Sequence, residues 1–152
     1  MNNLLKIFAT LFFSVSLYAE TVSVMTFNVE NLFDNRNDAY KTDETYLEFS
    51  KKQTPLHIKN CEKISTKRWR DDCLYIDWTD EVIEHKLNSI ASVILSYGSN
   101  GPDIIGLQEV ENKRILKQLF KKLEKAGYKH SVLLEGSDNL SLIHISEPTR
   151  RT

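Results

Sequence analysis

Apolar and polar positions along the chain follow the periods of strands and of helices in turn. Residues 22–28 (VSVMTFN) are rich in β-branched and apolar side chains and contain no breaker, which predicts a strand. Apolar side chains at both odd and even positions predict a central strand that is covered on both faces. Residues 103–109 (DIIGLQE) and 128–135 (YKHSVLLE) predict two further strands.

Two amphipathic helices are predicted between these strands. Thr79 can cap the first helix, which is expected to end near Gly98. Asn112 can cap the second helix, and Gly127 can supply the left-handed residue that closes it. The apolar stripes have helical spacing and consist of Ile83, Leu87, Ile90, Ile94 and Tyr97 in the first helix, and of Leu116, Leu119, Phe120 and Leu123 in the second.

Residues 34–78 follow neither period. They mix charges with scattered aromatic side chains, which predicts a long insertion that contains short helical pieces. A loop of this length in a compact domain is usually functional, or is held in place by a specific constraint.

The order of elements is strand, insertion, helix, strand, helix, strand. This alternation predicts an α/β fold in layers, and the helix after Thr79 makes the first two strands parallel neighbours. The carboxyl ends of these strands, at Asn28 and Glu109, are then expected at one edge of the sheet. Ligands of open α/β sheets bind at that edge.

The residues at these strand ends can carry chemistry. A carboxylate at a buried sheet edge is costly unless it is paired or bound to a cation, so Glu109 is a candidate ligand for Mg²⁺, Mn²⁺ or Ca²⁺. Asn28 can donate to a phosphate oxygen or orient a nucleophile, and Glu30 can add a second acidic group. The alternatives are a solvated or salt-bridged Glu109, an Asn28 that caps the following turn, and a Gln108 that only bonds the strand end.

Composition limits the choice of partners. The chain has 152 residues, 41% of them hydrophobic, which fits one globular domain. A net charge of −1 argues against a strongly basic face that tracks a phosphate backbone, without excluding nucleic acid. The run KKLEK at residues 121–125 is typical of the solvated face of a helix.

Residues 1–19 are typical of a secretory signal peptide, with Lys6 before an apolar run and Ala19 at a plausible cleavage point. A membrane-anchored N-terminus is the alternative, although the apolar run is short for a span, and no membrane span is expected after cleavage. We therefore expect export to the periplasm or secretion.

In an oxidising compartment Cys61 and Cys73 are expected to form a disulfide that stabilises the fold by about 3 kcal/mol, while metal binding by these thiols is the weaker alternative.

Two motifs resemble those of the endonuclease/exonuclease/phosphatase superfamily, which includes DNase I-like nucleases. MTFNVENLFD at residues 25–34 is similar to its TxNxxNLF pattern, and PDIIGLQEVEN at residues 102–112 to its PDIxxLQE pattern. The resemblance implies a four-layered α/β sandwich and Mg²⁺-assisted hydrolysis of phosphate esters, with water as the nucleophile. It implies a metal-ligand role for Glu109, a positioning role for Asn28 and a variable acidic role for Glu30. DNA, RNA, phospholipid headgroups and small phosphomonoesters all remain possible substrates, and family usage slightly favours a nuclease.

The chain departs from that superfamily toward its C-terminus. The superfamily pattern continues with an Asp–Asn strand and an Asp–His pair, but no GDxN motif is present and His144 has no preceding Asp. Within residues 140–152 the stretch SLIHISEPTR resembles translated sequencing adapter. We therefore expect residues 20–139 to be the N-terminal part of the domain and the tail to be non-native, against the alternative of a natural short strand.

Two expectations follow from this departure. The chain alone is expected to be inactive and poorly packed, because the base that activates water and the second sheet are missing. The alternative to an enzyme is a non-catalytic exported binding module that keeps the fold. His57 and His85 lie outside the motifs and are expected to be surface or structural residues.

Overall fold

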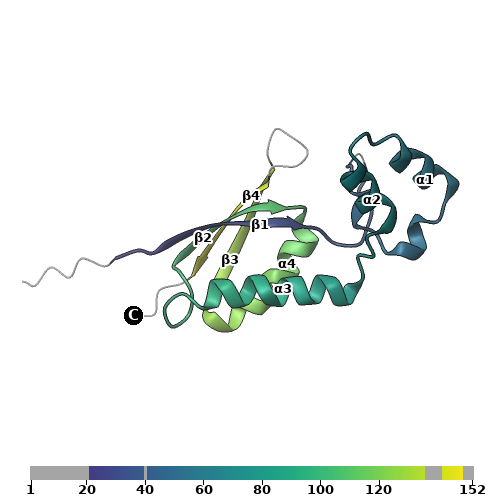
Figure 1. Ribbon diagram of the computed structural model, residues 1–152. Coiled ribbons are helices and arrows are strands. Elements are labelled where there is room, and N and C mark those ends of the chain that lie inside the picture. Colours follow the sequence, from purple (N-terminus) through teal and green to yellow (C-terminus); the bar gives the residue numbers. More distant parts are fainter. Residues whose placement is uncertain (1–20, 40, 136–141, 149–152) are drawn as a thin grey trace, which may run out of the picture.

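A computed structural model describes residues 21–39, 41–135 and 142–148 (Figure 1). The predicted signal peptide, residues 1–19, lies outside the described residues, as do residues 140–141 and 149–152 of the predicted tail. The elements, in chain order, are β1 (Val24–Leu32), η1 (Glu44–Tyr46), η2 (Phe49–Lys52), α1 (Pro55–Glu62), α2 (Lys67–Tyr75), α3 (Asp80–Leu95), β2 (Ile104–Val110), α4 (Lys113–Leu123), η3 (Glu124–Ala126), β3 (Tyr128–Glu135) and β4 (Leu142–Pro148).

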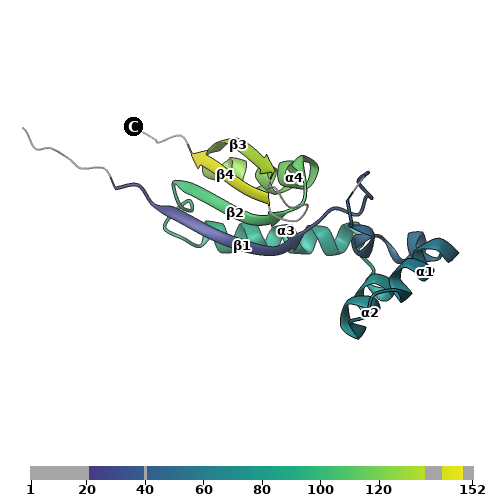
Figure 2. The same ribbon diagram turned by 90° about the horizontal axis from the view of Figure 1, so that it is seen from above.

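One four-stranded sheet organises the fold, with the strand order β1-β2-β4-β3. β1 and β2 are parallel, and β4 runs antiparallel to both β2 and β3. Helices α3 and α4 cover one face of the sheet (Figures 1 and 2). The main core lies between these helices and the sheet and includes Leu32, Leu87, Ile94, Ile105 and Leu119. The fold is therefore mixed α/β, with one sheet layer and one helix layer in the described residues.

The position of β1 differs from the sequence-based prediction. β1 lies at the sheet edge, and Val22 and Val24 are 47% and 64% exposed, so the prediction of a central strand covered on both faces is wrong. Met25 and Phe27 face the core, while Val132 and Leu134 of β3 are also exposed. An apolar, β-branched run has the same appearance whether or not its second face is covered, so composition could not distinguish the two cases.

The helix boundaries follow the predicted capping residues. Thr79 Oγ1 accepts from Val82 N at 3.4 Å, and Asn112 Oδ1 accepts from Arg114 N at 2.9 Å. Gly127 has a φ of +103°, the left-handed conformation expected for it. Tyr97 is 54% exposed because α3 ends at Leu95, so its placement on the buried stripe is wrong. Among the described helices, none has the length and apolarity needed to cross a membrane.

The insertion forms a small helical lobe beyond the end of β1 (Figure 2). Cys61 of α1 and Cys73 of α2 form the predicted disulfide. Aromatic contacts join the lobe to the strand: Tyr46 stacks on Phe33 with ring centroids 4.1 Å apart, and Trp78 Nε1 donates to Phe33 O at 3.0 Å. The insertion is therefore fixed at its base by Phe33 and internally by the disulfide.

Lys52 is buried inside this lobe. Only 1% of its surface is exposed, and its Nζ donates to Thr45 O at 2.5 Å and to Ile76 O at 2.7 Å. The ammonium thus joins the two ends of the lobe through backbone carbonyls. Buried ammonium groups are costly unless they are hydrogen-bonded in this way.

Replacing Lys52 with Met is expected to lower the free energy of unfolding by about 2 kcal/mol, because the carbonyls of Thr45 and Ile76 lose their donor. The measurement is urea denaturation followed by circular dichroism. Lys51→Met is the matched control, because Lys51 is an exposed neighbour whose ion pair is with Glu48. Equal midpoints for the two variants would contradict this role.

The stability that depends on Lys52 is expected to change with pH. Burial lowers the pKa of Lys52 from 10.5 to about 8, although Asp77 and Asp72 oppose the shift. Between these values the unfolded chain binds more protons than the folded chain, so the contribution of Lys52 to stability rises with pH across that window. The difference in unfolding free energy between wild type and Lys52→Met should therefore widen from about pH 8 upward. A constant or narrowing difference would be the opposite result.

Candidate active site

The polar strand ends meet at an irregularity in the sheet. Regular pairing of β1 with β2 runs to the pair Asn28 and Gln108 and resumes at Leu32 and Val110. Residues 29–31 therefore stand opposite a single residue, Glu109. Glu30, Asn31 and Glu109 have φ values of +51°, +63° and +64°. Positive φ in non-glycine residues costs about 1 kcal/mol or more each, and such strain concentrates at functional sites.

Asn28 and Glu109 are in direct contact. Asn28 Nδ2 donates to Glu109 Oε1 at 2.7 Å, and Asn31 N donates to Glu109 Oε2 at 3.0 Å. Each carboxylate oxygen thus receives one donor and keeps a second acceptor position. Asn28 Oδ1 accepts from Glu30 N at 2.8 Å, so Asn28 also caps the turn, which the sequence offered as the alternative. One amide side chain therefore shapes the turn and orients the carboxylate.

Glu30 takes part mainly through its backbone. Its carbonyl accepts from Lys86 Nζ at 2.6 Å, while its side chain is exposed. The structure thus brings Asn28 and Glu109 together and places Glu30 beside them, without a hydrogen bond between the two carboxylates. Gln108 occupies the last regular position of the β1–β2 pairing, in accord with its predicted strand-end place.

Lys86 adds a positive charge that the sequence analysis did not assign to the site. It is partly buried on α3, and its Nζ lies 5.6 Å from the centroid of the Trp78 ring. Burial lowers the pKa of Lys86, while the carboxylates of Glu30 and Glu109 raise it. The signal in the sequence was that Lys86 directly precedes Leu87, a core residue of α3. A lysine at the border of an apolar stripe can pack its long aliphatic chain along the stripe and extend its ammonium group beyond it.

The insertion also reaches the site through Tyr46. Burial raises the pKa of Tyr46, and the charges of Asp72 and Glu109 raise it further. Its ring lies edge-on to Trp78 with centroids 5.2 Å apart. Tyr46 of the lobe therefore lies within electrostatic range of Glu109, which its irregular sequence could not indicate.

A second group that the sequence pattern did not indicate is an ion-pair cluster around Arg114. Arg114 donates from Nε to Asp34 Oδ2 at 2.8 Å and forms an ion pair with Asp38 at 2.6 Å. Asp34 ends the first motif and is only 4% exposed, so its charge depends on this partner. The signal was the position of Asp34 and Arg114, each close to the end of one of the two motifs.

The groups at the strand ends fit a divalent cation. Glu109 is a partly exposed carboxylate whose two oxygens are held by donors and retain free lone pairs. Carboxylate ligands of metals are commonly hydrogen-bonded by such outer partners, which fix their orientation. Glu109 can therefore serve as a hard oxygen ligand with Asn28 as its support.

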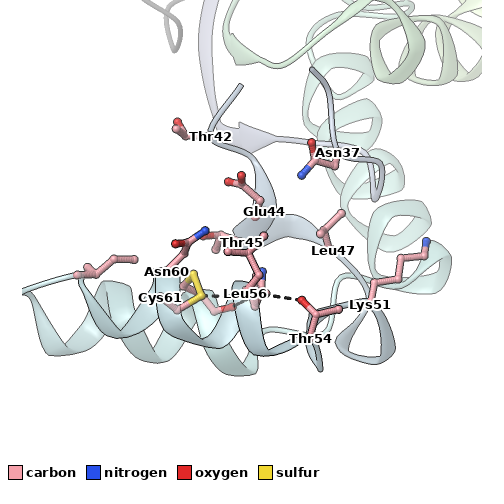
Figure 3. A pocket seen from close by; sticks show the side chains of 13 residues that line it. Asn37, Thr42, Glu44, Thr45, Leu47, Lys51, Thr54, Leu56, Asn60 and Cys61 are labelled. Atoms are coloured by element: carbon pink, nitrogen blue, oxygen red, sulfur yellow. Dashed lines mark hydrogen bonds between the residues drawn. A yellow bond between two sulfur atoms is a disulfide. The ribbon is translucent and has the colours of Figure 1, made fainter. Parts of the chain in front are cut away.

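A cavity lies away from the strand ends, in the helical lobe (Figure 3). It has a volume of about 600 Å³ and lies between Thr42 of the loop, Glu44 of η1 and side chains of α1 such as Asn60. His57, which also lines it, has its Nε2 3.1 Å from Cys73 O and 3.2 Å from Cys61 Sγ. His57 is thus a structural residue, as expected. Neither Asn28 nor Glu109 lines this cavity.

Comparison with known proteins gives one match. Residues 73–145 match the sequence model of the Endonuclease/Exonuclease/phosphatase family. The matched region includes Glu109 but not Asn28 or Glu30. No curated protein and no solved structure matches the chain significantly. The family match, with Glu109 inside it at the end of β2, supports the endonuclease/exonuclease/phosphatase superfamily for this chain.

Proposed function

We propose that the strand-end site takes part in hydrolysis of phosphate ester bonds that depends on Mg²⁺ or Mn²⁺. The observation that carries this proposal is the 2.7 Å hydrogen bond by which Asn28 holds the Glu109 carboxylate where two parallel strands end. Superfamily membership supports phosphate esters, such as nucleic acids, as the substrate class. Among these, we place DNA and RNA first, by analogy with family usage.

Each residue has a distinct part in this proposal. Glu109 holds the cation, and Asn28 together with Asn31 N keeps its carboxylate in one orientation. Lys86 places a positive charge beside Glu30 and Glu109, which favours an anionic phosphate at the same edge. A bound divalent cation supplies Lewis acidity toward the phosphoryl oxygens and stabilises the charge that develops in the displacement.

We also propose that the protein is exported. The disulfide between Cys61 and Cys73 supports this, because disulfides persist in oxidising compartments such as the periplasm or the extracellular space. We further propose the four-layered α/β sandwich of the superfamily as the complete fold, which the family match supports. The exposed sheet face at Val24 and Val132 is compatible with a further layer.

Glu109→Gln is expected to raise the Kd for Mn²⁺ at the strand-end site at least about 10-fold, because it removes the ligand charge. Asn28→Ala should weaken binding about 10- to 100-fold, the usual cost of losing an outer-shell partner. Both are measured by Mn²⁺ titration with electron paramagnetic resonance. Glu124→Gln, which removes an exposed carboxylate of η3, is the control and should bind as wild type. If Glu109→Gln binds Mn²⁺ with the same Kd as wild type, the assignment of Glu109 as the metal ligand is wrong.

The 152-residue chain itself is expected to release no phosphate and cleave no DNA above the level of Glu109→Gln. The Asp–His pair that supplies the general base in the superfamily pattern is not found among the 152 residues. The assay combines a phosphodiester substrate, linear DNA and Mg²⁺. Turnover that disappears in Glu109→Gln would refute the expected inactivity while supporting the site.

A further inference from the structure

A second group of carboxylates lies at the junction of β2 and α4, apart from the residues that hold Glu109. It consists of Asp38 and Asp43, from the start of the insertion, and Glu111, which directly follows β2. Asp43 is 2% exposed and Glu111 is 7% exposed. One side-chain oxygen from each of the three residues lies within 4.8 Å of the other two. We call this set the junction site.

Most carboxylate oxygens around the junction site have donors. Glu111 Oε2 accepts from Asp34 N at 2.9 Å, and Asp43 Oδ2 accepts from Asp38 N at 2.8 Å. Asp38 Oδ1 accepts from Arg114 at 2.6 Å, and Asp38 Oδ2 accepts from Asn112 at 3.1 Å. The carboxylates are therefore already held in place by the backbone and by neighbouring side chains.

Two oxygens at the centre of the junction site have no such donor. Asp43 Oδ1 and Glu111 Oε1 are buried and have no hydrogen-bond partner among the described residues. Burying a carboxylate oxygen without a partner is costly, so native proteins rarely leave two of them together. The two side chains lie close enough to hydrogen-bond when one of them is protonated, so either a proton or a cation must lie between them.

The local charge points to a cation as that group. The guanidinium of Arg114 pairs with Asp34 and with Asp38 of the junction site, and neither Asp43 nor Glu111 forms an ion pair with a described residue. Arg114 therefore does not compensate the charges of Asp43 and Glu111. A divalent cation between these two side chains would neutralise them and supply both missing contacts.

The donor set favours calcium. All three side chains offer hard oxygen atoms, which suit Ca²⁺ and Mg²⁺ and not softer metals. Ca²⁺ takes six to eight oxygen ligands, several of them from protein carboxylates, whereas Mg²⁺ usually keeps several waters and is bound by one or two carboxylates. A largely buried set of three carboxylates therefore suits Ca²⁺ better than Mg²⁺.

We propose that Asp38, Asp43 and Glu111 bind a Ca²⁺ ion that fastens the start of the insertion to the β2–α4 junction. This ion is structural and is separate from the cation proposed at Glu109. It would join two segments that are far apart in sequence and hold the lobe that carries Tyr46 beside the strand ends. The competing occupant is a proton shared by Glu111 and Asp43.

The test is Ca²⁺ binding to the 152-residue chain, measured by isothermal titration calorimetry with calcium chloride. Asp43→Asn and Glu111→Gln are each expected to raise the Kd for this ion at least about 10-fold, because each removes a charged ligand. Glu44→Gln changes the adjacent carboxylate outside the junction site and should bind Ca²⁺ as wild type. Circular dichroism of each variant verifies that it has kept the fold.

A second readout separates a cation from a proton. With EDTA present, Asp43→Asn should melt at or above the wild-type temperature, because it relieves repulsion. Excess Ca²⁺ should raise the melting temperature of wild type by about 5 °C or more and leave that of Asp43→Asn unchanged. No Ca²⁺ binding by wild type, or equal Ca²⁺ binding by wild type and Asp43→Asn, would overturn the proposal in favour of the shared proton.

The variant Glu109→Gln separates this inference from the proposed function. It should keep Ca²⁺ binding at the junction site while losing Mn²⁺ binding at the strand ends. Ca²⁺ binding that is lost in Glu109→Gln but kept in Asp43→Asn would overturn the junction site alone. Mn²⁺ binding that is insensitive to Glu109→Gln would overturn only the strand-end site.

Discussion

The parallel pairing of β1 with β2 is the constraint on which the rest of the structure depends. It brings residues that are 81 positions apart in the chain into contact, so that Asn28 can hold Glu109 at 2.7 Å. The break in this pairing at residues 29–31 gives three non-glycine residues a positive φ and aims polar groups at the sheet edge. This turn is held by the hydrogen bonds that Glu109 accepts from Asn28 and Asn31, and by the hydrogen bond from Lys86 Nζ to the carbonyl of Glu30. The buried side chain of Leu32 fixes its far end in the core.

Away from the strand ends, the stability of the fold depends on whether each buried charge has a partner. Arg114 neutralises Asp34, and Lys52 is satisfied by two backbone carbonyls inside the lobe. Glu111 is the exception, since burial, more than any other effect, raises its pKa to about 8 and the nearby acids Asp34 and Asp43 add to the shift. The insertion is thus attached to the sheet by aromatic packing at Phe33 and by an acidic contact in which Glu111, with its raised pKa, keeps its proton near neutral pH when no cation is bound.

The sequence predicted most of the scaffold because its strongest signals are local. Thr79, Asn112 and Gly127 mark helix ends by their own hydrogen bonds and conformation, and the structure confirms all three. The parallel neighbours also followed, since a helical crossover leaves little choice of topology. The exposed face of β1 could not be predicted from the sequence, because whether a strand face is covered depends on packing against distant segments. Lys86, Tyr46 and Arg114 were missed for the same reason: their partners are distant in sequence.

The most direct test of the strand-end metal site is a crystal of the protein grown with Mn²⁺, with the ion located by its anomalous scattering. We expect a peak about 2.1 Å from a carboxylate oxygen of Glu109, with the hydrogen bond from Asn28 Nδ2 retained on that side chain. Strong anomalous density elsewhere on the chain, with none at Glu109, would contradict the claim that the two strand ends form a metal site.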